Sequence, residues 1–272
     1  MKIVVTCDFT AATDNALAWA AVMAQQDVGS EIVLVHVQER GANLRLSIDQ
    51  TKRHIQALAA DSATRYAVPV SGKVIEGSLN TALPLQALEL QAQFVVMGTH
   101  GISGVQHLFG SKAIKLIAGS EVPFLVVQDA PKVGEMPFQR LLVPMGVRPE
   151  EVEKCSFAVT VAQHYGSHVY IGLIPYSDPA FKARQAGNIA LIKRLLTTNG
   201  IPFTIEEAQQ KLSVVENCQL ITEKYHCDSM LIAVTQKARG IAAAFNSADQ
   251  DLVANAMSLP VFCINSTMSV RW

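Results

Sequence analysis

Residues 98–111 are the part of this chain best suited to chemistry. Their sequence is Gly-Thr-His-Gly-Ile-Ser-Gly-Val-Gln-His-Leu-Phe-Gly-Ser, so four glycines fall within thirteen residues, directly after an apolar segment. Glycine lets backbone N–H groups approach an anion closely and adopts positive φ without strain. The first turn of a following helix would add its own N–H groups and its dipole. The stretch therefore predicts a phosphate-binding loop, with a turn built on structural glycines as the alternative.

Other catalytic and nucleotide-binding patterns are absent from the sequence. No GxxxxGK followed by Ser or Thr occurs, and residues 98–111 lack the GxGxxG spacing of a dinucleotide-binding turn. The seven histidines are scattered and form no Ser-His-Asp or Cys-His arrangement. We therefore expect no catalytic residues.

Asp8 is the second candidate for chemistry. It follows the expected strand Ile3–Thr6 and so lies at the same sheet edge as the glycine-rich stretch. A carboxylate there can accept hydrogen bonds from a ribose or adenine group, or hold a divalent cation through water. The alternative is an acid that complements the dipole of the next helix, which Thr10 or Thr13 can cap.

The elements that position these residues follow an alternating pattern of strands and helices. The expected strands are Ile3–Thr6, Ile32–Val37, Val70–Ile75, Phe94–Met97 (ended by Gly98) and Val122–Val127. Segments of helical periodicity lie between them, and polar residues 38–50 are expected to form a loop. Strands that are apolar on both faces indicate a parallel sheet covered on both sides, with ligands outside the carboxyl ends of the strands.

The whole pattern repeats after about 137 residues. Lys2–Asp8 matches Arg140–Gly146, Phe94–Gly98 matches Ser229–Ala233, and four further segments match in the same order. The segment between the repeats, Asp129–Phe138, contains prolines and a glycine, as a linker does. We therefore expect two domains, residues 1–130 and residues 139–272.

Composition limits the partners and the compartment. The 22 basic and 23 acidic residues give a net charge of −1, and neither half has the basic excess of a nucleic-acid-binding protein. No apolar run reaches the ~18–20 residues of a membrane span, and the N-terminus has no signal-peptide layout. The five cysteines form no CxxC pair and predict free thiols in a reducing cytoplasm. We expect a cytoplasmic protein that binds neither nucleic acid nor membrane.

Several of these segments resemble the universal stress protein family in its tandem, two-domain form. The segments are Ile3–Ala20, Leu34–Val37, Val96–Gly101, Phe109–Ser111 and Val122–Val127. The resemblance covers the first half nearly completely and extends to the second half through the repeat. It implies two Rossmann-like domains of the adenine nucleotide alpha hydrolase-like type. Each would have a five-stranded parallel sheet of order 3-2-1-4-5 with helices on both faces.

Many members of that family bind ATP through the motif G-x2-G-x9-G-S/T. Gly98 and Gly101 match its first two glycines, and Gly110 and Ser111 match its end. The spacer here has eight residues instead of nine, which shortens the turn that delivers the phosphate-binding N–H groups. The resemblance implies ATP or ADP as the ligand, with or without Mg²⁺.

The resemblance also assigns the rest of the site. It places Asp8 at the adenosine and lets Val37 meet the adenine through its backbone. Met97 and Gly98 would line the ribose, and His100 stands where members often have a basic residue near the phosphates. A solvated loop histidine is the alternative for His100.

The second half departs from this pattern. Gly146 replaces the aspartate, and Ala233, Gln236 and Asn246 replace three glycines, while Ser247 is retained. A side chain at a former glycine position blocks close backbone approach. We expect a degenerate repeat that serves packing or another ligand. Its corresponding edge keeps polar residues that we expect to form a wet surface loop, with binding of a different anion as the alternative; they are Thr235, Gln236, Lys237, Arg239, Asn246 and Ser247.

The sequence therefore predicts a regulatory, adenine-nucleotide-binding stress module, not an enzyme. A slow ATPase and an interaction protein that binds no nucleotide are the alternatives. Phe124–Val127 and Val261–Ile264 would be the apolar edge strands of the two sheets. Exposed apolar edges invite aggregation, so we expect these strands to pair within one chain as a pseudo-dimer. Association of two chains into a homodimer would be a further step.

Overall fold

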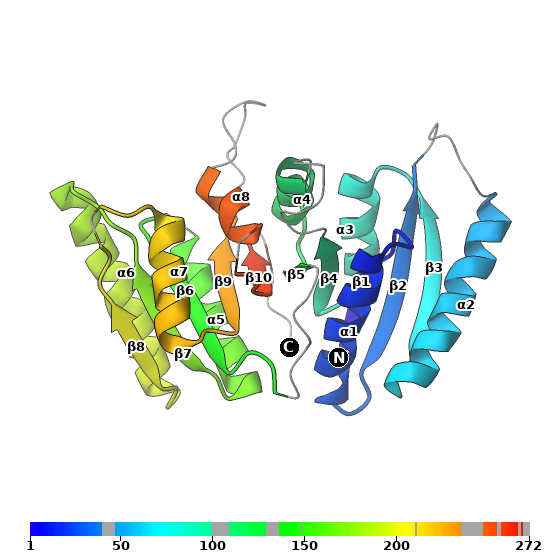
Figure 1. Ribbon diagram of the computed structural model, residues 1–272, viewed down its shortest axis with the longest axis horizontal. Coiled ribbons are helices and arrows are strands. Elements are labelled where there is room, and N and C mark those ends of the chain that lie inside the picture. Colours follow the sequence, from blue (N-terminus) through cyan, green and yellow to red (C-terminus); the bar gives the residue numbers. More distant parts are fainter. Residues whose placement is uncertain are drawn as a thin grey trace. The chain divides into compact units, whose positions relative to one another are not determined.

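The computed structural model describes residues 1–39, 47–99, 109–128, 136–148, 150–209, 211–234, 247–254, 257–265 and 268, with residues 109–112 and 247 described by their backbone alone. The chain divides into two compact units. Unit 1 comprises Met1–Val133 with Thr267–Trp272, and unit 2 comprises Gly134–Ser266. Unit 1 runs from blue to green in Figure 1, and unit 2 runs from green to red.

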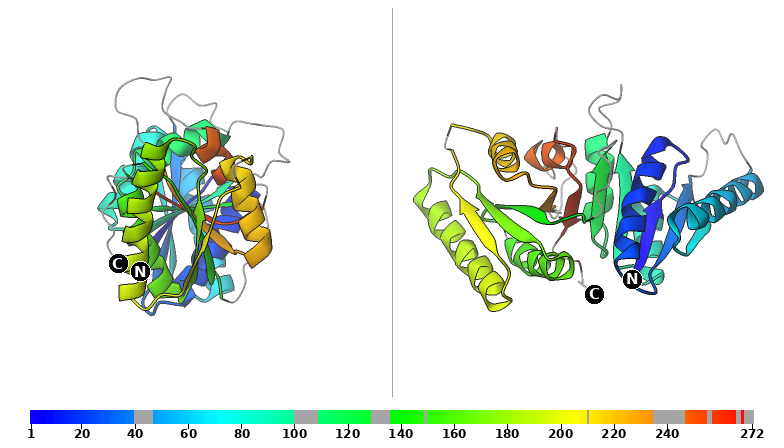
Figure 2. Two further views of the ribbon diagram at one scale, coloured as in Figure 1. Left: turned by 90° about the vertical axis from the view of Figure 1, so that its left-hand side faces the viewer. Right: turned by 60° about the horizontal axis from the view of Figure 1, so that its bottom comes forward.

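Unit 1 alternates strands with helices throughout. Its elements are β1 (Lys2–Thr6), α1 (Ala11–Gln25), β2 (Glu31–Gln38), α2 (Ile48–Tyr66), β3 (Val70–Glu76), α3 (Leu79–Glu89), β4 (Phe94–Thr99), α4 (Phe109–Ala118) and β5 (Phe124–Gln128). The strands are parallel and lie in the order β3-β2-β1-β4-β5. Helix α1 packs beside α2, and α3 packs beside α4 (Figure 2), so the two pairs cover opposite faces of the sheet.

Unit 2 repeats this plan. Its elements are β6 (Arg140–Met145), α5 (Glu151–Tyr165), β7 (His168–Leu173), α6 (Pro179–Thr198), β8 (Phe203–Glu206), α7 (Val214–Tyr225), β9 (Ser229–Ala233), α8 (Ser247–Val253) and β10 (Val261–Ile264). Its parallel strands lie in the order β8-β7-β6-β9-β10. Both units therefore have the expected order 3-2-1-4-5, and the predicted fold class is confirmed.

Equivalent backbone hydrogen bonds confirm the internal repeat residue by residue. Gln93 N–H donates to Lys2 O in unit 1, and Asp228 N–H donates to Arg140 O in unit 2. In the sheet, Ile3 pairs with Phe94 as Leu141 pairs with Ser229. These pairings make Gly146 the equivalent of Asp8, and Ala233 the equivalent of Gly98.

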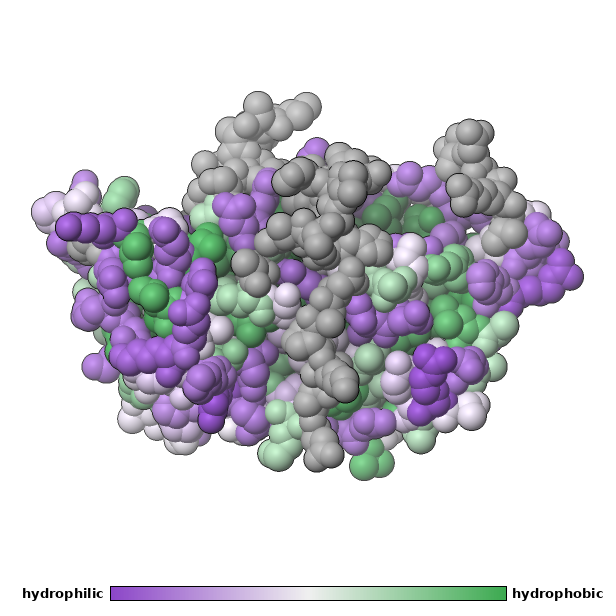
Figure 3. All heavy atoms as spheres, in the orientation of Figure 1, coloured by the Kyte–Doolittle hydropathy of each residue, from purple (hydrophilic) through white to green (hydrophobic). Residues whose placement is uncertain are grey.

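Helix α2 begins earlier than the polar character of its first residues indicated. The expected loop over residues 38–50 is wrong at its end, because α2 starts at Ile48. Ser47 and Gln50 form a capping box, in which each side chain accepts the other residue's backbone N–H. This exchange satisfies two N–H groups that would otherwise lack partners at the helix start. Along the helix, Thr51, Ile55, Ala59 and Ser62 are buried at helical spacing, and the outer surface over α2 is mainly hydrophilic (Figure 3).

Two boundaries near the glycine-rich stretch also differ from the expectation. Strand β4 does not end at Met97 but continues through Gly98 and Thr99, because both residues pair with β5. Helix α4 begins at Phe109, so Gly110 and Ser111 belong to its first turn and not to the loop before it.

Large apolar side chains fill the core of each unit. Phe94 and Phe124 are completely buried in unit 1. In unit 2, the rings of Phe138 and Phe262 pack edge to face with centroids 4.8 Å apart. The five cysteines are free, buried thiols, as predicted. Among the described residues, no helix combines the length and the apolar character needed to cross a membrane.

Candidate nucleotide site at the carboxyl edge of unit 1

The carboxyl ends of three neighbouring strands bring the predicted adenosine residues to neighbouring levels of the sheet. Thr6 of β1 pairs with Val35 of β2, so Asp8 lies level with Val37 two residues further on. On the other side of β1, Val5 pairs with Val96 of β4, so Met97 lies level with Thr6 and Gly98 lies level with Cys7, one residue before Asp8. Met97 is buried, Val37 is partly exposed and Asp8 is exposed.

Asp8 organises the start of helix α1. Its Oδ1 atom accepts hydrogen bonds from the Thr10 backbone N–H at 3.0 Å, the Thr10 hydroxyl at 2.6 Å and the Thr13 hydroxyl at 2.9 Å. The Asp8 backbone N–H donates in turn to Thr13 Oγ1 at 3.0 Å. The structural role that the sequence left open for Asp8 is therefore present. The exposed position of this carboxylate also suits a second role toward a ligand.

Thr13 is a site residue whose full role sequence reasoning missed. It was expected only as a possible helix cap, but Thr10 is the N-cap of α1 and Thr13 lies inside the helix. Its hydroxyl both donates to the Asp8 side chain and accepts from the Asp8 backbone. A signal was available, because a threonine five residues after a strand-end aspartate can reach back to it across one helical turn.

Phe9 is a further residue that the sequence did not single out. Its backbone has a φ of 60°, which is uncommon for a residue other than glycine. This conformation stacks the Phe9 ring on His54 of α2, with centroids 4.5 Å apart, and places it 4.9 Å from the His36 ring. His36 Nδ1 hydrogen-bonds the Cys7 carbonyl at 2.8 Å. The aromatic cluster fixes the β1–α1 turn from the β2 side.

Gly98 has a packing role besides the predicted ligand role. A Cβ atom at this position would lie 1.8 Å from the carbonyl oxygen of Ala12, a backbone atom in the first turn of α1. No other residue fits there without moving the helix. Gly98 thus allows the start of α1 to touch the end of β4, which closes the site on the β4 side.

The phosphate side of the predicted site is described only in part. Gly110 and Ser111 lie in the first turn of α4, where backbone N–H groups have no partner within the helix and can bind an anion. His100 and Gly101 lie outside the described residues. Their predicted roles stay predictions.

Cys7, the residue before Asp8, is buried. Burial is the main cause that raises the pKa of the Cys7 thiol to about 11, so this thiol is a poor nucleophile at neutral pH. Among the described residues, no group of three or more His, Cys, Asp or Glu side chains is placed to hold a metal ion.

The family model of the universal stress proteins matches residues 1–128, which is nearly all of unit 1 and includes its last strand, β5. Residues 1–128 therefore form a universal stress protein domain. No curated protein matches the chain significantly.

Two solved universal stress proteins share the fold over nearly the whole chain. One from Archaeoglobus fulgidus is 13% identical, with 97% of this chain and 98% of that chain covered and a TM-score of 0.75. One from Pseudomonas aeruginosa is 15% identical, with 98% and 93% covered and a TM-score of 0.62. A universal stress protein from Arabidopsis thaliana with AMP bound is 13% identical, covers 48% of this chain and 92% of its own, and has a TM-score of 0.35. The first two likenesses show that unit 2 has the universal stress protein fold despite its divergent sequence.

Proposed function

We propose that unit 1 binds one adenine nucleotide, ATP or ADP, at the carboxyl edge of its sheet, as part of a regulatory stress module. The observation that carries this proposal is the junction around β1, where Asp8 and Val37 lie at one level, one residue beyond Gly98, beside the start of α1. Open parallel sheets bind ligands at this place, where the order of the strands reverses. The glycine-rich stretch joins this junction to the first turn of α4, which suits a phosphate chain.

Each residue has a definite part in the proposed complex. Asp8 accepts hydrogen bonds from the ribose. The backbone of Val37 recognises the adenine edge, and Met97 and Gly98 line the ribose. His100, Gly101, Gly110 and Ser111 surround the phosphates. Where Mg²⁺ accompanies the phosphates, Asp8 would hold it through water.

Isothermal titration with ATP, ADP, AMP and cyclic AMP tests this proposal. Wild-type protein should bind ATP or ADP with a stoichiometry of one per chain. Asp8→Asn keeps an oxygen that can accept from Thr10 and Thr13, so it should preserve folding while it weakens binding. Gly187→Ala is the matched control, because Gly187 lies in unit 2 and a Cβ there meets nothing within 4 Å. Absence of binding by folded wild-type protein would leave the interaction protein without nucleotide as the better account.

We also propose that ATP hydrolysis at this site is very slow. Fast phosphoryl transfer needs a positioned metal, a residue that orients water and fixed cations, and the sequence near the phosphates offers only His100 and Lys112. Turnover should therefore lie far below the ~1–10³ per second of typical enzymes. ADP release at about one per second in a single-turnover assay, abolished by Asp8→Ala, would instead make the site an active site.

The compartment and the assembly of the protein are also part of the proposal. All five cysteines are free, which suits the reducing cytoplasm. Strands β5 and β10 are the apolar ends of their own sheets, so we retain the proposal that they pair within one chain and that chains associate in pairs. Sedimentation velocity tests the second point, and a disulfide between cysteines introduced into β5 and β10 tests the first.

A further inference from the structure

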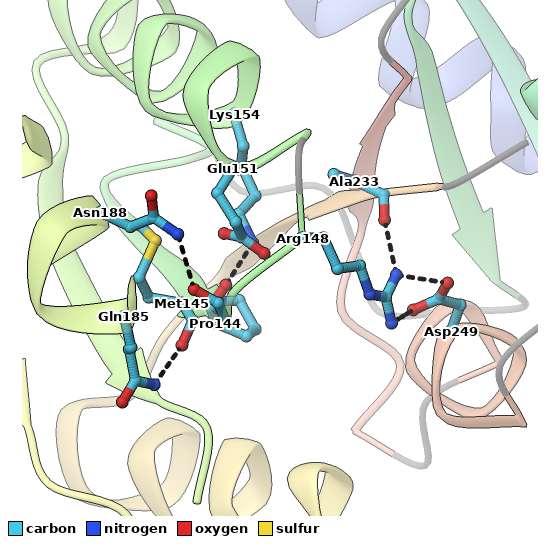
Figure 4. Close-up of polar contacts among 10 residues, drawn as sticks. Pro144, Met145, Arg148, Glu151, Lys154, Gln185, Asn188, Ala233 and Asp249 are labelled. Carbon is cyan, nitrogen blue, oxygen red and sulfur yellow. Dashed lines mark hydrogen bonds and ion pairs between the residues drawn. The ribbon is translucent and has the colours of Figure 1, made fainter. Parts of the chain in front are cut away.

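The strand-end carbonyl groups of unit 2 are bound by the unit's own side chains (Figure 4). Lys154 donates to Pro144 O, and Arg148 donates to Ala233 O at 3.3 Å. Gln185 donates to Met145 O at 2.8 Å and to Ile174 O at 2.9 Å. Asn188 donates to Gly146 O at 2.9 Å. These carbonyls belong to the edge that is equivalent to the candidate site of unit 1. A ligand at this edge would have to displace several donors at once.

Gln185 occupies the place equivalent to the proposed adenine position. Its amide, from α6, is buried and bridges carbonyls at the ends of two adjacent strands, β6 and β7. By the register of the two sheets, Ile174 is the equivalent of Val37, whose backbone is the proposed partner of the adenine in unit 1. Because the Gln185 amide already donates to both carbonyls, a base that bound there would have to displace it.

The space equivalent to the Asp8 side chain is also filled. A Cβ atom on Gly146 would lie 3.1 Å from the Tyr176 hydroxyl and 3.2 Å from Glu151 Oε1. The carboxylate missing from the strand end is therefore supplied by α5 instead. Glu151 is buried and is ion-paired with Lys154 at 2.7 Å, so its charge is already compensated. Burial, followed by the Glu151 charge, raises the pKa of Tyr176 and keeps this phenol neutral.

An ion pair links the end of β9 to α8, the two elements that would flank the phosphates of a bound nucleotide. Arg148 binds Asp249 of α8 through two parallel hydrogen bonds of 2.7 and 2.8 Å, and it also reaches the last residue of β9, Ala233. The equivalent walls in unit 1 are the end of β4 and the first turn of α4. Burial opposes the charge of Arg148, but the bonds to Asp249 outweigh it and raise the pKa of the guanidinium. The ion pair is thus a fixed link between β9 and α8.

We infer that these side chains form an internal plug that closes the carboxyl edge of unit 2 to small-molecule ligands. The plug residues are Arg148, Glu151, Lys154, Tyr176, Gln185, Asn188 and Asp249. They bind the carbonyl groups of Pro144, Met145, Gly146, Ile174 and Ala233 from within, so these carbonyls need no ligand to satisfy them. The inference concerns unit 2 alone and holds whether or not unit 1 binds nucleotide.

Amide chemical shifts of the full chain test the plug with defined ligands. Adenosine and ATP are added separately to 10 mM, and the resonances of Gly146 and Ile174 are followed. The plug predicts no saturable shift at either residue. Saturable shifts at these residues would overturn it, while shifts confined to Val37 and Gly98 would support nucleotide binding in unit 1 and leave the plug intact.

Hydrogen exchange of two neighbouring variants tests whether the bridging amide holds the edge shut. Gln185→Ala should speed amide exchange at the ends of β6 and β7 at least tenfold and leave unit 1 unchanged. Arg184→Ala, an exposed position on the same helix, is the matched control and should exchange like wild type. Equal exchange in the two variants would show that Gln185 does not hold the edge, and would refute the plug.

Discussion

Replacement of Gly98 by alanine is the most informative single change in unit 1. The new Cβ atom would lie 1.8 Å from Ala12 O, 2.5 Å from Ala12 C and 3.0 Å from Ala12 Cα. All three are backbone atoms, so no side chain can rotate away to make room. Either the start of α1 or the end of β4 must move by about 1.7 Å, which is the difference between 1.8 Å and an ordinary contact of about 3.5 Å.

The expected cost follows from what such a movement breaks. Overpacking a tight core typically costs about 1–3 kcal/mol, and displacement of α1 also weakens the Asp8–Thr10–Thr13 network, whose charged hydrogen bonds are worth about 1.5–3 kcal/mol each. We therefore expect Gly98→Ala to destabilise unit 1 by about 3–5 kcal/mol and to lower its melting temperature by roughly 10 °C. Nucleotide binding should fall with it.

Calorimetric melting of Gly98→Ala beside Gly187→Ala measures this effect. Gly187 lies inside helix α6 with open space around it, so alanine there should stabilise unit 2 by roughly 0.5–1 kcal/mol. A Gly98→Ala protein within 0.5 kcal/mol of wild type would refute the close packing of β4 against α1. If that stable variant also failed to bind nucleotide, Gly98 would act on the ligand alone.

Three further predictions follow from unit 2 and from the thiols. Native protein should show no thiol that reacts rapidly with a disulfide reagent at pH 8, because burial raises the pKa values of the thiols. Unfolded protein should show five reactive thiols. One rapidly reacting thiol in the native state would contradict this. Arg148→Ala should destabilise unit 2 by about 2–3 kcal/mol in a denaturant titration, because it leaves a buried carboxylate and a carbonyl without their donor. Hydrogen bonds from Tyr225 and then Lys224 lower the pKa of Glu206, so its contribution to stability is present above the unfolded value of about 4.5 and disappears as the pH falls through the lower folded pKa. Glu206→Gln should therefore flatten the stability profile on the acid side of pH 4.5, and Glu207→Gln, the control, should not.

The arrangement of strands was predictable because it depends on local and repeated features. Short apolar runs alternate with helical periodicity, and the same pattern occurs twice, so the parallel sheet follows from the sequence. The boundaries were less predictable. The capping box of Ser47 and Gln50 lies in a polar stretch that resembles a loop, and hydrogen bonding, not hydrophobicity, starts α2 there.

The candidate site was predictable in position and only partly in role. Asp8 and Gly98 stood out by type, but their contacts with Thr13 and Ala12 depend on how α1 approaches the sheet. The plug of unit 2 could not be predicted at all. Gln185 is 40 residues from Met145, whose carbonyl it binds, and nothing in the local sequence of α6 indicates a buried amide. The loss of glycines suggested an inactive repeat, whereas the structure shows what fills its edge.

Titration of the pure, nucleotide-free chain with ATP, followed by calorimetry, tests the central claim most directly. The account predicts one site per chain, weakened by Asp8→Asn and unchanged by Arg184→Ala. Two equivalent sites per chain would contradict the proposed asymmetry between the nucleotide site of unit 1 and the plugged edge of unit 2. No site at all, in a chain that melts as a folded protein, would contradict the assignment of the unit 1 edge to nucleotide binding.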